Sequence, residues 1–325
     1  MKLIPAIART CAVAMLAAGS PVAYSQAYPA KPVRVVIPFP PGQATDIIAR
    51  VVSQKLGDAL GRQFIVDNRP GANGIIGIET VTKAPADGYT LLVTASGSLV
   101  INPNLYSKLP YAPLKDLAPI ALLGLIPLVV VAHPSLPAKT IPQLIALSKS
   151  KPGQLSYASS GPGSAQHLAM ELLKWRTGMD LLHVPYKGSA PAVTDVIAGH
   201  VPLMFDTIAS SLPNIRAGRV RALAVGLANR SGVLPNVQTM DEAGVKGFQV
   251  AGWAGFLAPA NTPQAIVQQL NGEVLKILGQ ADTKERIVSL GMEPASTTPE
   301  EFAAFMKSET AKWAQAVKLS GVKIE

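Results

Sequence analysis

Two loops of this sequence combine glycine, proline and small polar residues between a strand pattern and a helix pattern. The first loop, Phe39–Asp46, follows the β-branched run Val33–Pro38, and the second, Ser159–Ser164, follows Leu155–Ala158. A strand-to-helix turn of this kind points the unpaired N–H groups of the helix start beyond the C-terminal end of the strand. Those N–H groups, together with the helix dipole and nearby hydroxyls, are suited to bind a carboxylate.

The energies allow such a site to work without a cationic side chain. Removing a carboxylate from water costs several kcal/mol, whereas each hydrogen bond to a charged group contributes about 1.5–3 kcal/mol. Four or five such bonds therefore offset the cost. Gly42, Gly161 and Gly163 let the backbone approach a ligand closely because they have no Cβ.

Each loop taken alone is equally well explained as an ordinary capped turn. Thr45 or Asp46 in the first loop and Ser164 in the second are good N-cap residues whatever the function. The two loops nevertheless occupy matching positions in two sets of strands. That correspondence favours a shared binding site.

Polar residues at the ends of other strand patterns extend the candidate site. Ser96 and Ser98 either add hydroxyls to it or belong to an ordinary turn, and Asp206 either accepts from a ligand or fixes a neighbouring turn. His167, in the first turn of the second helix, either reaches the ligand or caps that turn. The predicted ligand-binding residues are Phe39, Pro41, Gly42, Gln43, Ala44, Thr45, Asp46, Ser96, Ser98, Ser159, Ser160, Gly163, Ser164, His167, Tyr186 and Asp206.

Catalytic and metal sites are not predicted. The sequence contains no Gly-x-Ser-x-Gly elbow, Walker loop, Gly-x-Gly-x-x-Gly fingerprint or His-Glu-x-x-His motif, and its histidines lack a recognised metal-ligand spacing. The spacing Gly71-x-x-Gly74-x-x-Gly77 resembles a phosphate loop only superficially and predicts a turn into a packed helix. We expect a binding protein with no enzymatic activity, no metal and no cofactor.

The charge pattern argues against a nucleic-acid partner. The chain has 29 Lys and Arg residues against 20 Asp and Glu, a net charge of +9, but these residues are scattered and only 5% of residues are aromatic. A weak positive field favours the capture of anions. Proteins that bind nucleic acid, however, typically have a basic stripe with stacking aromatic side chains.

The first residues predict a cleaved secretory signal. Lys2 and Arg9 precede the apolar stretch Thr10–Ala18, and Ser25 and Ala27 are small residues suited to a peptidase site, with cleavage after residue 27. An uncleaved anchor is the alternative, but the stretch is shorter than the roughly 20 residues that a membrane span needs. The single cysteine, Cys11, lies in this stretch, so the mature protein would have no thiol. We expect export to the periplasm.

The remaining chain of about 298 residues is long enough for two domains. Short β-branched runs alternate with helix patterns, as in an α/β fold with largely parallel strands. We expect residues 28–126 and 230–325 to form lobe 1, and residues 127–229 to form lobe 2. The chain would cross between them near Leu125–Leu128 and again within Leu227–Phe248, and two crossings permit a hinge.

The sequence resembles the extracytoplasmic solute receptors of tripartite tricarboxylate transporters, the Bug family, over essentially the whole mature chain. The segments that carry the resemblance are Tyr28–Arg34, Phe39–Gly42, Ala44–Asp46, Asn68–Ala72, Ala86–Leu91, His183–Gly188 and Arg221–Val225. The resemblance implies a type II periplasmic-binding-protein fold, in which two lobes enclose a ligand cleft. It also implies that a small organic carboxylate is held by residues 41–46 and 159–164, and that membrane permease subunits are the partners. We expect a monomer.

One position departs from the family pattern. The family's first loop usually reads Gly-Gly where this chain has Gly42-Gln43. The Gln43 side chain either projects out of the cleft or adds an amide to it. If it enters the cleft, Gln43→Gly should alter affinity or ligand choice.

The sequence leaves two uses of such a cleft open. A transport receptor delivers its ligand to a permease, whereas a sensor subunit presents the closed form to a signalling partner. Both need the same closed cleft, and the sequence does not identify which carboxylate is bound.

Overall fold

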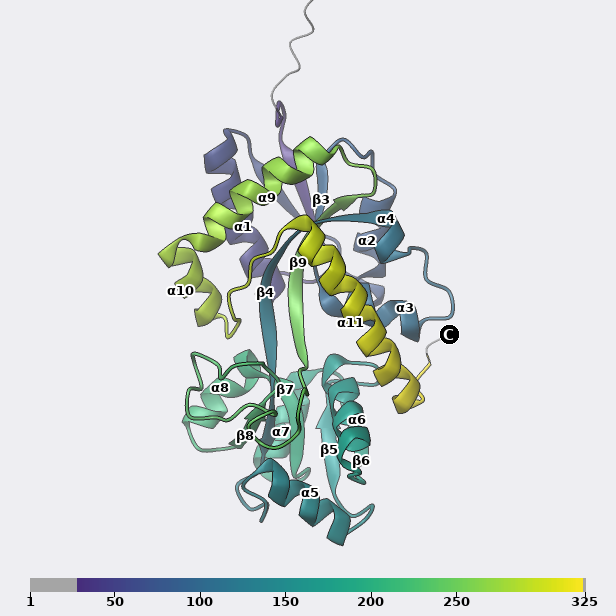
Figure 1. Ribbon diagram of the computed structural model, residues 1–325, viewed down its shortest axis with the longest axis vertical. Helices are drawn as coiled ribbons and strands as arrows, with labels where there is room; N and C mark the ends of the chain where they lie inside the picture. The colour runs from purple at the N-terminus through teal and green to yellow at the C-terminus, as the bar shows by residue number, and fades with distance from the viewer. Residues whose placement is uncertain (1–27, 324–325) are drawn as a thin grey trace, which may run out of the picture.

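A computed structural model describes residues 28–323, and the predicted signal peptide lies outside them. Within these residues nine strands form one strongly bent sheet in the order β2-β1-β3-β9-β4-β7-β5-β6, with β8 paired to β4. Helices cover the sheet in two stacked groups (Figure 1). None of the described helices has the length and apolarity needed to cross a membrane.

The upper lobe is defined by one end of this sheet. Parallel β1 (Val33–Ile37), β2 (Phe64–Asn68) and β3 (Thr90–Ala95) pair side by side, and β9 (Ala251–Pro259) runs antiparallel to β3. The residues of β1, β3 and β9 are largely apolar and buried, as expected for strands covered on both faces, whereas in β2 only Phe64 is buried. The helices of this lobe are α1 (Ala44–Leu60), α2 (Ile75–Thr82), α3 (Asn102–Leu105), α4 (Pro113–Asp116), α9 (Gln264–Gly279) and α10 (Ala281–Ser289).

The lower lobe is built on the other end of the sheet. Its strands are β5 (Ser156–Ser159), β6 (Leu182–Pro185), β7 (Leu203–Thr207) and β8 (Arg221–Val225). Its helices are α5 (Ile141–Ser150), α6 (Ala165–Thr177), α7 (Ser189–Ala198) and α8 (Ile208–Arg216). Helix α8 is not predicted from the sequence, in part because Pro213 lies inside it. The Thr207 hydroxyl caps its start.

A single long strand, β4 (Leu117–Ala132), connects the lobes. Its first part pairs with β9 as far as the Pro127–Ala251 register pair, and Leu128–Ala132 pairs with β7 and β8. The sequence predicts a strand and a crossover over residues 120–132, whereas the structure has one continuous strand from Leu117. Its register with β9 shifts after Pro119 and again after Leu122, and such irregularities bend a strand and increase its local twist.

The chain returns to the upper lobe through β9. Before that, residues 226–250 run beside the connection between the lobes: Gly226 N–H donates to Leu128 O, Val250 N–H donates to Gly226 O, and the Ser231 hydroxyl donates to Glu293. The two connecting segments are therefore neighbours in one antiparallel pair. The lobe boundaries expected from the sequence, with residues 28–126 and 230–325 in one lobe and residues 127–229 in the other, stay a prediction.

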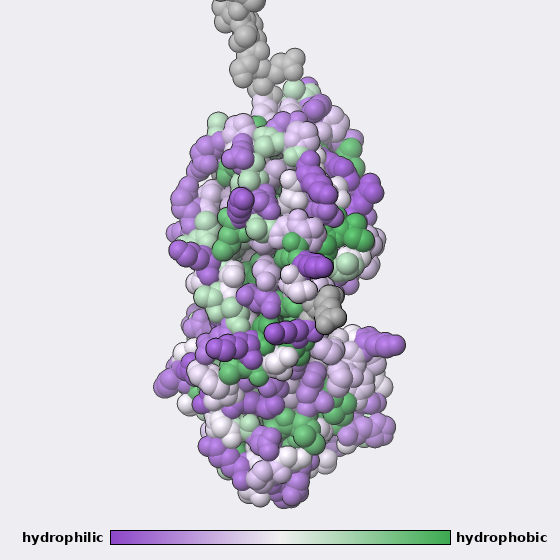
Figure 2. All heavy atoms as spheres, turned by 90° about the vertical axis from the view of Figure 1, so that its right-hand side faces the viewer, coloured by the Kyte–Doolittle hydropathy of each residue, from purple (hydrophilic) through white to green (hydrophobic). Residues whose placement is uncertain are grey.

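The last helix, α11 (Pro299–Ser320), extends beside both lobes (Figure 1). A capping box between Thr298 and Glu301 starts it. Its buried Phe302 and Trp313 pack into an apolar core shared with residues of α6 in the lower lobe. Viewed from the side of this helix, polar residues cover most of the surface and apolar ones form small groups (Figure 2).

Candidate functional site

A cavity of about 260 Å³ opens where the two lobes meet. Its wall combines the loop after β1, the segment after β3 and the loop between β5 and α6. The predicted residues Phe39, Ser98, Ser160, Gly163 and Ser164 lie in it. The full lining is Phe39, Asn73, Ala95, Gly97, Ser98, Ile101, Asn102, Leu105, Ser160, Pro162, Gly163, Ser164 and Ala165. Tertiary structure thus brings the ends of both predicted loops to one cavity.

The loop after β1 is held by a buried carboxylate. Gly42, with φ +88°, donates its N–H to Asp46 Oδ2 at 2.9 Å, and Arg50 Nε donates to the same oxygen at 3.0 Å. Asn68 Nδ2 donates to Asp46 Oδ1 at 2.9 Å and to Phe39 O at 3.0 Å. Burial alone would raise the pKa of Asp46, but these hydrogen bonds outweigh it and hold the pKa below its ordinary value.

In this hydrogen-bond network Asp46 fixes the conformation of the loop after β1. The sequence predicts Thr45 or Asp46 as the N-cap of α1, but the cap is Gln43, whose side chain makes no capping bond. Asp46 instead sits in the first helical turn, where it neutralises part of the exposed N–H array. Within residues 28–323 the N–H groups of Ala44 and Thr45 have no hydrogen-bond acceptor.

The residues of this loop beyond Phe39 lie outside the cavity lining. Pro41, Gly42 and Gln43 are exposed, Ala44 is partly exposed, and Thr45 is buried. From this loop, Phe39 alone therefore borders the cavity.

The loop between β5 and α6 is held by neutral groups. Ser164 caps α6 by accepting from His167 N–H at 3.2 Å, and Gly163, with φ +74°, donates its N–H to His167 Nδ1 at 3.1 Å. Ser159 Oγ accepts from Gly161 N–H at 3.1 Å, and Ser160 Oγ donates to Gln166 Oε1 at 3.0 Å. Ser159 is fully buried, so its hydroxyl holds the loop from the interior of the lobe.

His167 is buried and uncharged at neutral pH. Its ring stacks on His183 with 3.9 Å between centroids, and the Tyr157 ring lies close to both, with its centroid 5.0 Å from that of His183 and 6.4 Å from that of His167. Burial, followed by the neighbouring His183, lowers the pKa of His167 to about 4. The unprotonated Nδ1 can therefore accept from Gly163, and this contact explains why a histidine stands four residues after the glycine.

The two serines after β3 have different surroundings. Ser98 lines the cavity, and its hydroxyl donates to Asn73 O at 2.9 Å. Ser96 is also buried but accepts from Trp253 N–H at 3.3 Å on β9. Only Ser98 is placed at the cavity.

Tyr186 and Asp206 are turned toward other partners. The Tyr186 hydroxyl donates to Asp195 Oδ2 at 2.6 Å, and burial followed by this hydrogen bond raises the pKa of Tyr186 to about 12. The fully buried Asp206 accepts from Ser189 at 2.6 Å and from Ser211 at 2.7 Å. Burial outweighs these bonds and raises its pKa. Asp206 thus ties α7 to α8, and its predicted contact with a ligand stays a prediction.

The cavity also contains residues that the sequence did not single out. Asn73 belongs to the turn Gly71–Gly74, whose four residues all have positive φ, including Ala72 at 46° and Asn73 at 52°. Asn102 Nδ2 donates to Asn73 O at 3.1 Å, which fixes this strained turn. The Asn73-Gly74 pair could have indicated this turn from the sequence, since both residues tolerate positive φ. No sequence pattern indicated that Leu105 lines the cavity.

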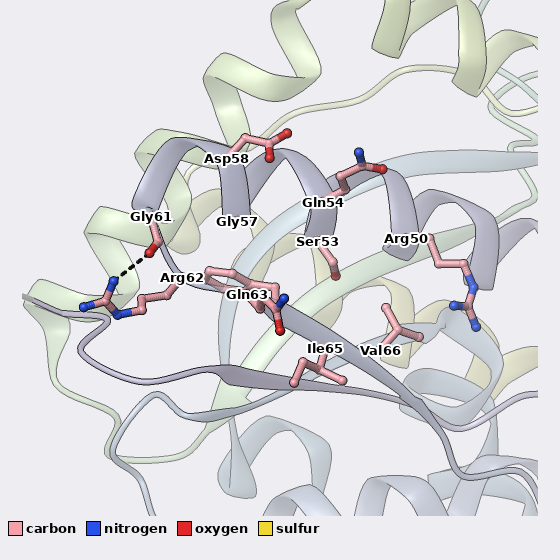
Figure 3. Close-up of a pocket in the computed structure, with 11 residues that line it drawn as sticks. Arg50, Ser53, Gln54, Gly57, Asp58, Gly61, Arg62, Gln63, Ile65 and Val66 are labelled. Carbon is pink, nitrogen blue, oxygen red and sulfur yellow. Dashed lines mark hydrogen bonds between the residues drawn. The ribbon is translucent and has the colours of Figure 1, made fainter.

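A second hollow, of about 600 Å³, lies between α1 and β2 on the outer face of the upper lobe (Figure 3). Ser53 points toward β2, with Arg50 at one end and Arg62 at the other. Arg62 donates to Gly61 O at 2.8 Å and Arg50 is bonded to Asp46, so both cations are engaged. This hollow contains none of the predicted residues and involves one lobe alone. Within residues 28–323 no cluster of His, Cys, Asp and Glu is arranged to hold a metal ion.

Comparisons with known proteins show which family the chain belongs to. The model of the tripartite tricarboxylate transporter family receptor, TctC, matches residues 48–322. Protein BugT of Bordetella pertussis is 38% identical over 299 residues, which cover 92% of this chain and 92% of BugT.

Two solved structures share both sequence and fold with the chain. The R. palustris protein Rpa4515, solved with adipate, has a TM-score of 0.78 and 35% identity over 91% of this chain and 99% of its own. MatC of Rhodopseudomonas palustris, solved with bound malate, has a TM-score of 0.72 and 33% identity over 89% of this chain and all of its own (100%). The two-lobed periplasmic-binding-protein fold expected from the sequence is confirmed. The chain belongs to the tripartite tricarboxylate transporter receptor family, which includes the Bug proteins.

Proposed function

We propose that this receptor captures a small organic carboxylate in the periplasm, in the cavity between its lobes, and delivers it to the membrane subunits of a tripartite tricarboxylate transporter. The observation that carries the proposal is the shared cavity, which joins the loop after β1 to the start of α6. Two relatives solved with adipate and malate support the ligand class.

The start of α6 is the best place for the carboxylate. Within residues 28–323 the N–H groups of Ala165 and Gln166 have no acceptor, and Ala165 and Ser164 line the cavity. An anion there meets free N–H donors at the positive end of the helix dipole. The donors of α1 near Ala44 and Thr45 would complete the site when the lobes close.

Closure would occur about the β4–β9 pair. We propose that residues 28–126 and 230–325 move as one lobe against residues 127–229. Leu105 of the upper lobe packs directly against Gly163 of the lower lobe, since a Cβ built on Gly163 would lie 2.5 Å from Leu105 Cδ2. Closing over the ligand excludes water and strengthens each hydrogen bond to the carboxylate.

Capture and release require no reaction, so we propose a monomeric receptor without enzymatic activity. Use as a sensor for a signalling partner is the second candidate function, because it needs the same closed form. Pull-down of membrane proteins with and without ligand separates the two: recovery of permease subunits supports transport, and recovery of a membrane-bound signalling protein supports sensing.

Mass spectrometry of the small molecules that co-purify with the protein, followed by a thermal-shift panel of carboxylates, tests ligand binding. A ligand that binds only the folded state stabilises it by about 2.7 kcal/mol at 100 times its Kd, so a clear rise in Tm is expected. The ligand should be recovered unchanged. A panel without any Tm shift, or conversion of the ligand, would contradict the proposal.

A further inference from the structure

A small cavity of about 110 Å³ lies between α11 and the two segments that connect the lobes. Its lining includes Gly226, Gln249 and Ala251 from the connecting segments, and Glu309 and Lys312 from α11. Protein interiors are normally packed with few voids larger than a water molecule. Apolar packing therefore leaves the connection incompletely supported at this point, and the polar contacts that α11 makes there gain in importance.

Glu309, in the middle of α11, is a buried carboxylate with a complete set of partners. Its side chain accepts from Trp253 Nε1 at 3.3 Å and from Trp313 Nε1 at 3.1 Å, and it forms an ion pair with Lys312. Glu309 is 5% exposed, and both tryptophans are fully buried. A charge is tolerated in such a place when it is paired and hydrogen-bonded. Because Trp253 belongs to β9, the carboxylate ties α11 to a strand of the connection.

Lys312 extends this attachment beyond the end of β9. Its Nζ, besides pairing with Glu309, donates to Gln249 O at 3.3 Å. Gln249 and Trp253 lie on opposite sides of Ala251, the first residue of β9. One turn of α11 therefore holds the chain on both sides of the point where it enters β9.

The connecting segments change partners at the same point. The β4–β9 ladder ends at the Pro127–Ala251 pair. Beyond it Val250 N–H donates to Gly226 O, and Gly226 N–H donates to Leu128 O. Gly226 has no room for a Cβ beside Val250 O, so these two main chains stay together. Hinges are usually a few residues at the ends of elements, and a bend here turns the segment that contains Gln249 relative to β9.

We propose that Glu309 and Lys312 form a clamp that restricts bending of the lobes about the Pro127–Ala251 end of the β4–β9 ladder. The proposal rests on the lobe motion of the proposed function and names the residues that limit it. A bend moves Gln249 O relative to the Trp253 indole, whereas the clamp holds both. Bending then breaks the Lys312 bond or draws its ammonium away from the buried carboxylate, which is unfavourable. The clamp narrows the range of lobe arrangements in the ligand-free receptor, so less conformational freedom is lost when a ligand binds.

Spin labels on the two lobes test the clamp in the ligand-free protein. The chain cleaved after residue 27 has no cysteine of its own, and Asp58→Cys on α1 and Lys149→Cys on α5 place labels at exposed positions. Double electron–electron resonance gives the distribution of distances between the labels. Lys312→Met keeps an unbranched side chain without the charge, and it should broaden this distribution at least about twofold.

Lys307→Met is the matched control, because it removes the same charge from an exposed position of α11, and it should leave the width at the wild-type value. Glu309→Gln loses the ion pair but keeps an acceptor for an indole, and it should broaden the distribution to a similar extent. If Lys312→Met or Glu309→Gln has a native circular dichroism spectrum and the wild-type width, the inference is overturned.

Adipate and the other acids of a carboxylate panel, added to the labelled wild type, separate this result from the proposed function. An acid that raises the Tm should also shift the mean distance between the labels as the lobes close. An unchanged mean distance with such an acid would contradict closure over the ligand. The clamp is judged only by the width of the distribution in the ligand-free protein, so the two proposals fail independently.

Discussion

The two loops of the site use the same backbone device with different chemistry. In each, a glycine with positive φ donates its N–H to the side chain four residues later: Gly42 to Asp46, and Gly163 to His167. The acceptor is a charged carboxylate in the upper lobe and a neutral imidazole in the lower lobe. Both loops are thus preorganised, but they differ in their response to protons.

They differ in their surroundings as well. A Cβ on Gly42 would meet no atom within 4 Å, whereas one on Gly163 would collide with Leu105 of the other lobe. The upper loop is fixed within its own lobe, while the lower loop forms part of the contact between lobes. Substitutions at matching positions should therefore have unequal effects.

The largest contrast is expected between the two glycines. Gly163→Ala should weaken ligand binding at least about thirtyfold, because it adds a clash with Leu105 to the strain of a non-glycine residue at φ +74°. Gly42→Ala carries a similar backbone strain without a clash, so its loss should stay below about fivefold. Calorimetric titration measures both, and equal losses would show that the contact between lobes does not matter for binding.

Next in size is the removal of the carboxylate from the upper loop. Asp46→Ala removes the acceptor of Gly42 N–H and leaves Asn68 Nδ2 with Phe39 O alone, and it should lower the free energy of unfolding by about 2 kcal/mol. Asp58→Ala on the same helix is the control, because Asp58 is exposed, and it should change stability by less than about 0.5 kcal/mol. Urea denaturation gives both values, and similar values for the two variants would exclude a fixing role for Asp46.

A smaller effect is expected from pH at the lower loop. The pKa of His167 is about 4 in the fold against an ordinary value of 6.5, so the unfolded chain takes up its proton first. The stabilisation that neutral His167 provides is complete above about pH 6.5, and it declines as the pH falls toward 4. Protonation below that value removes the acceptor of Gly163 N–H. The titratable groups near the ring are His183, Glu171, Lys174 and Tyr157.

His167→Gln isolates this contribution, because glutamine can accept a hydrogen bond but does not titrate in this range. Ligand affinity measured between pH 7 and 4 should fall about fivefold more in the wild type than in the variant. The protonation of the ligand itself affects both proteins alike. Parallel pH profiles would assign the loss to other groups.

The smallest effect is expected at the position that departs from the family pattern. The Gln43 side chain is exposed, makes no capping bond and lies outside the cavity lining, so Gln43→Gly should change ligand affinity less than about twofold. Thermal shift across the carboxylate panel checks this. A changed ligand preference would indicate that Gln43 enters the cleft when the lobes close.

Much of the fold and part of the site follow from local sequence. The sequence predicts one helix from about Ile141 to Ser150 and another over Ala165–Thr177, and the structure has both with these bounds. The agreement is close because Thr140 and Ser164 are strong N-caps directly before apolar periodic segments. The strands are predicted to within a few residues, apart from the first part of β4. Both glycine loops are placed correctly after their strands.

What the sequence by itself determined is therefore the set of elements and the two anion-suited loops between them, since caps, turns and periodicity depend on neighbours in the chain. Tertiary structure alone decided what each side chain meets. Asp46 accepts a hydrogen bond from Asn68, 22 residues away, and Asp206 accepts one from Ser189, 17 residues away. Leu105 reaches the cavity because β4 and β9 bring the lobes together. Such contacts depend on how segments that are distant in the sequence pack together, so no local sequence pattern predicts them.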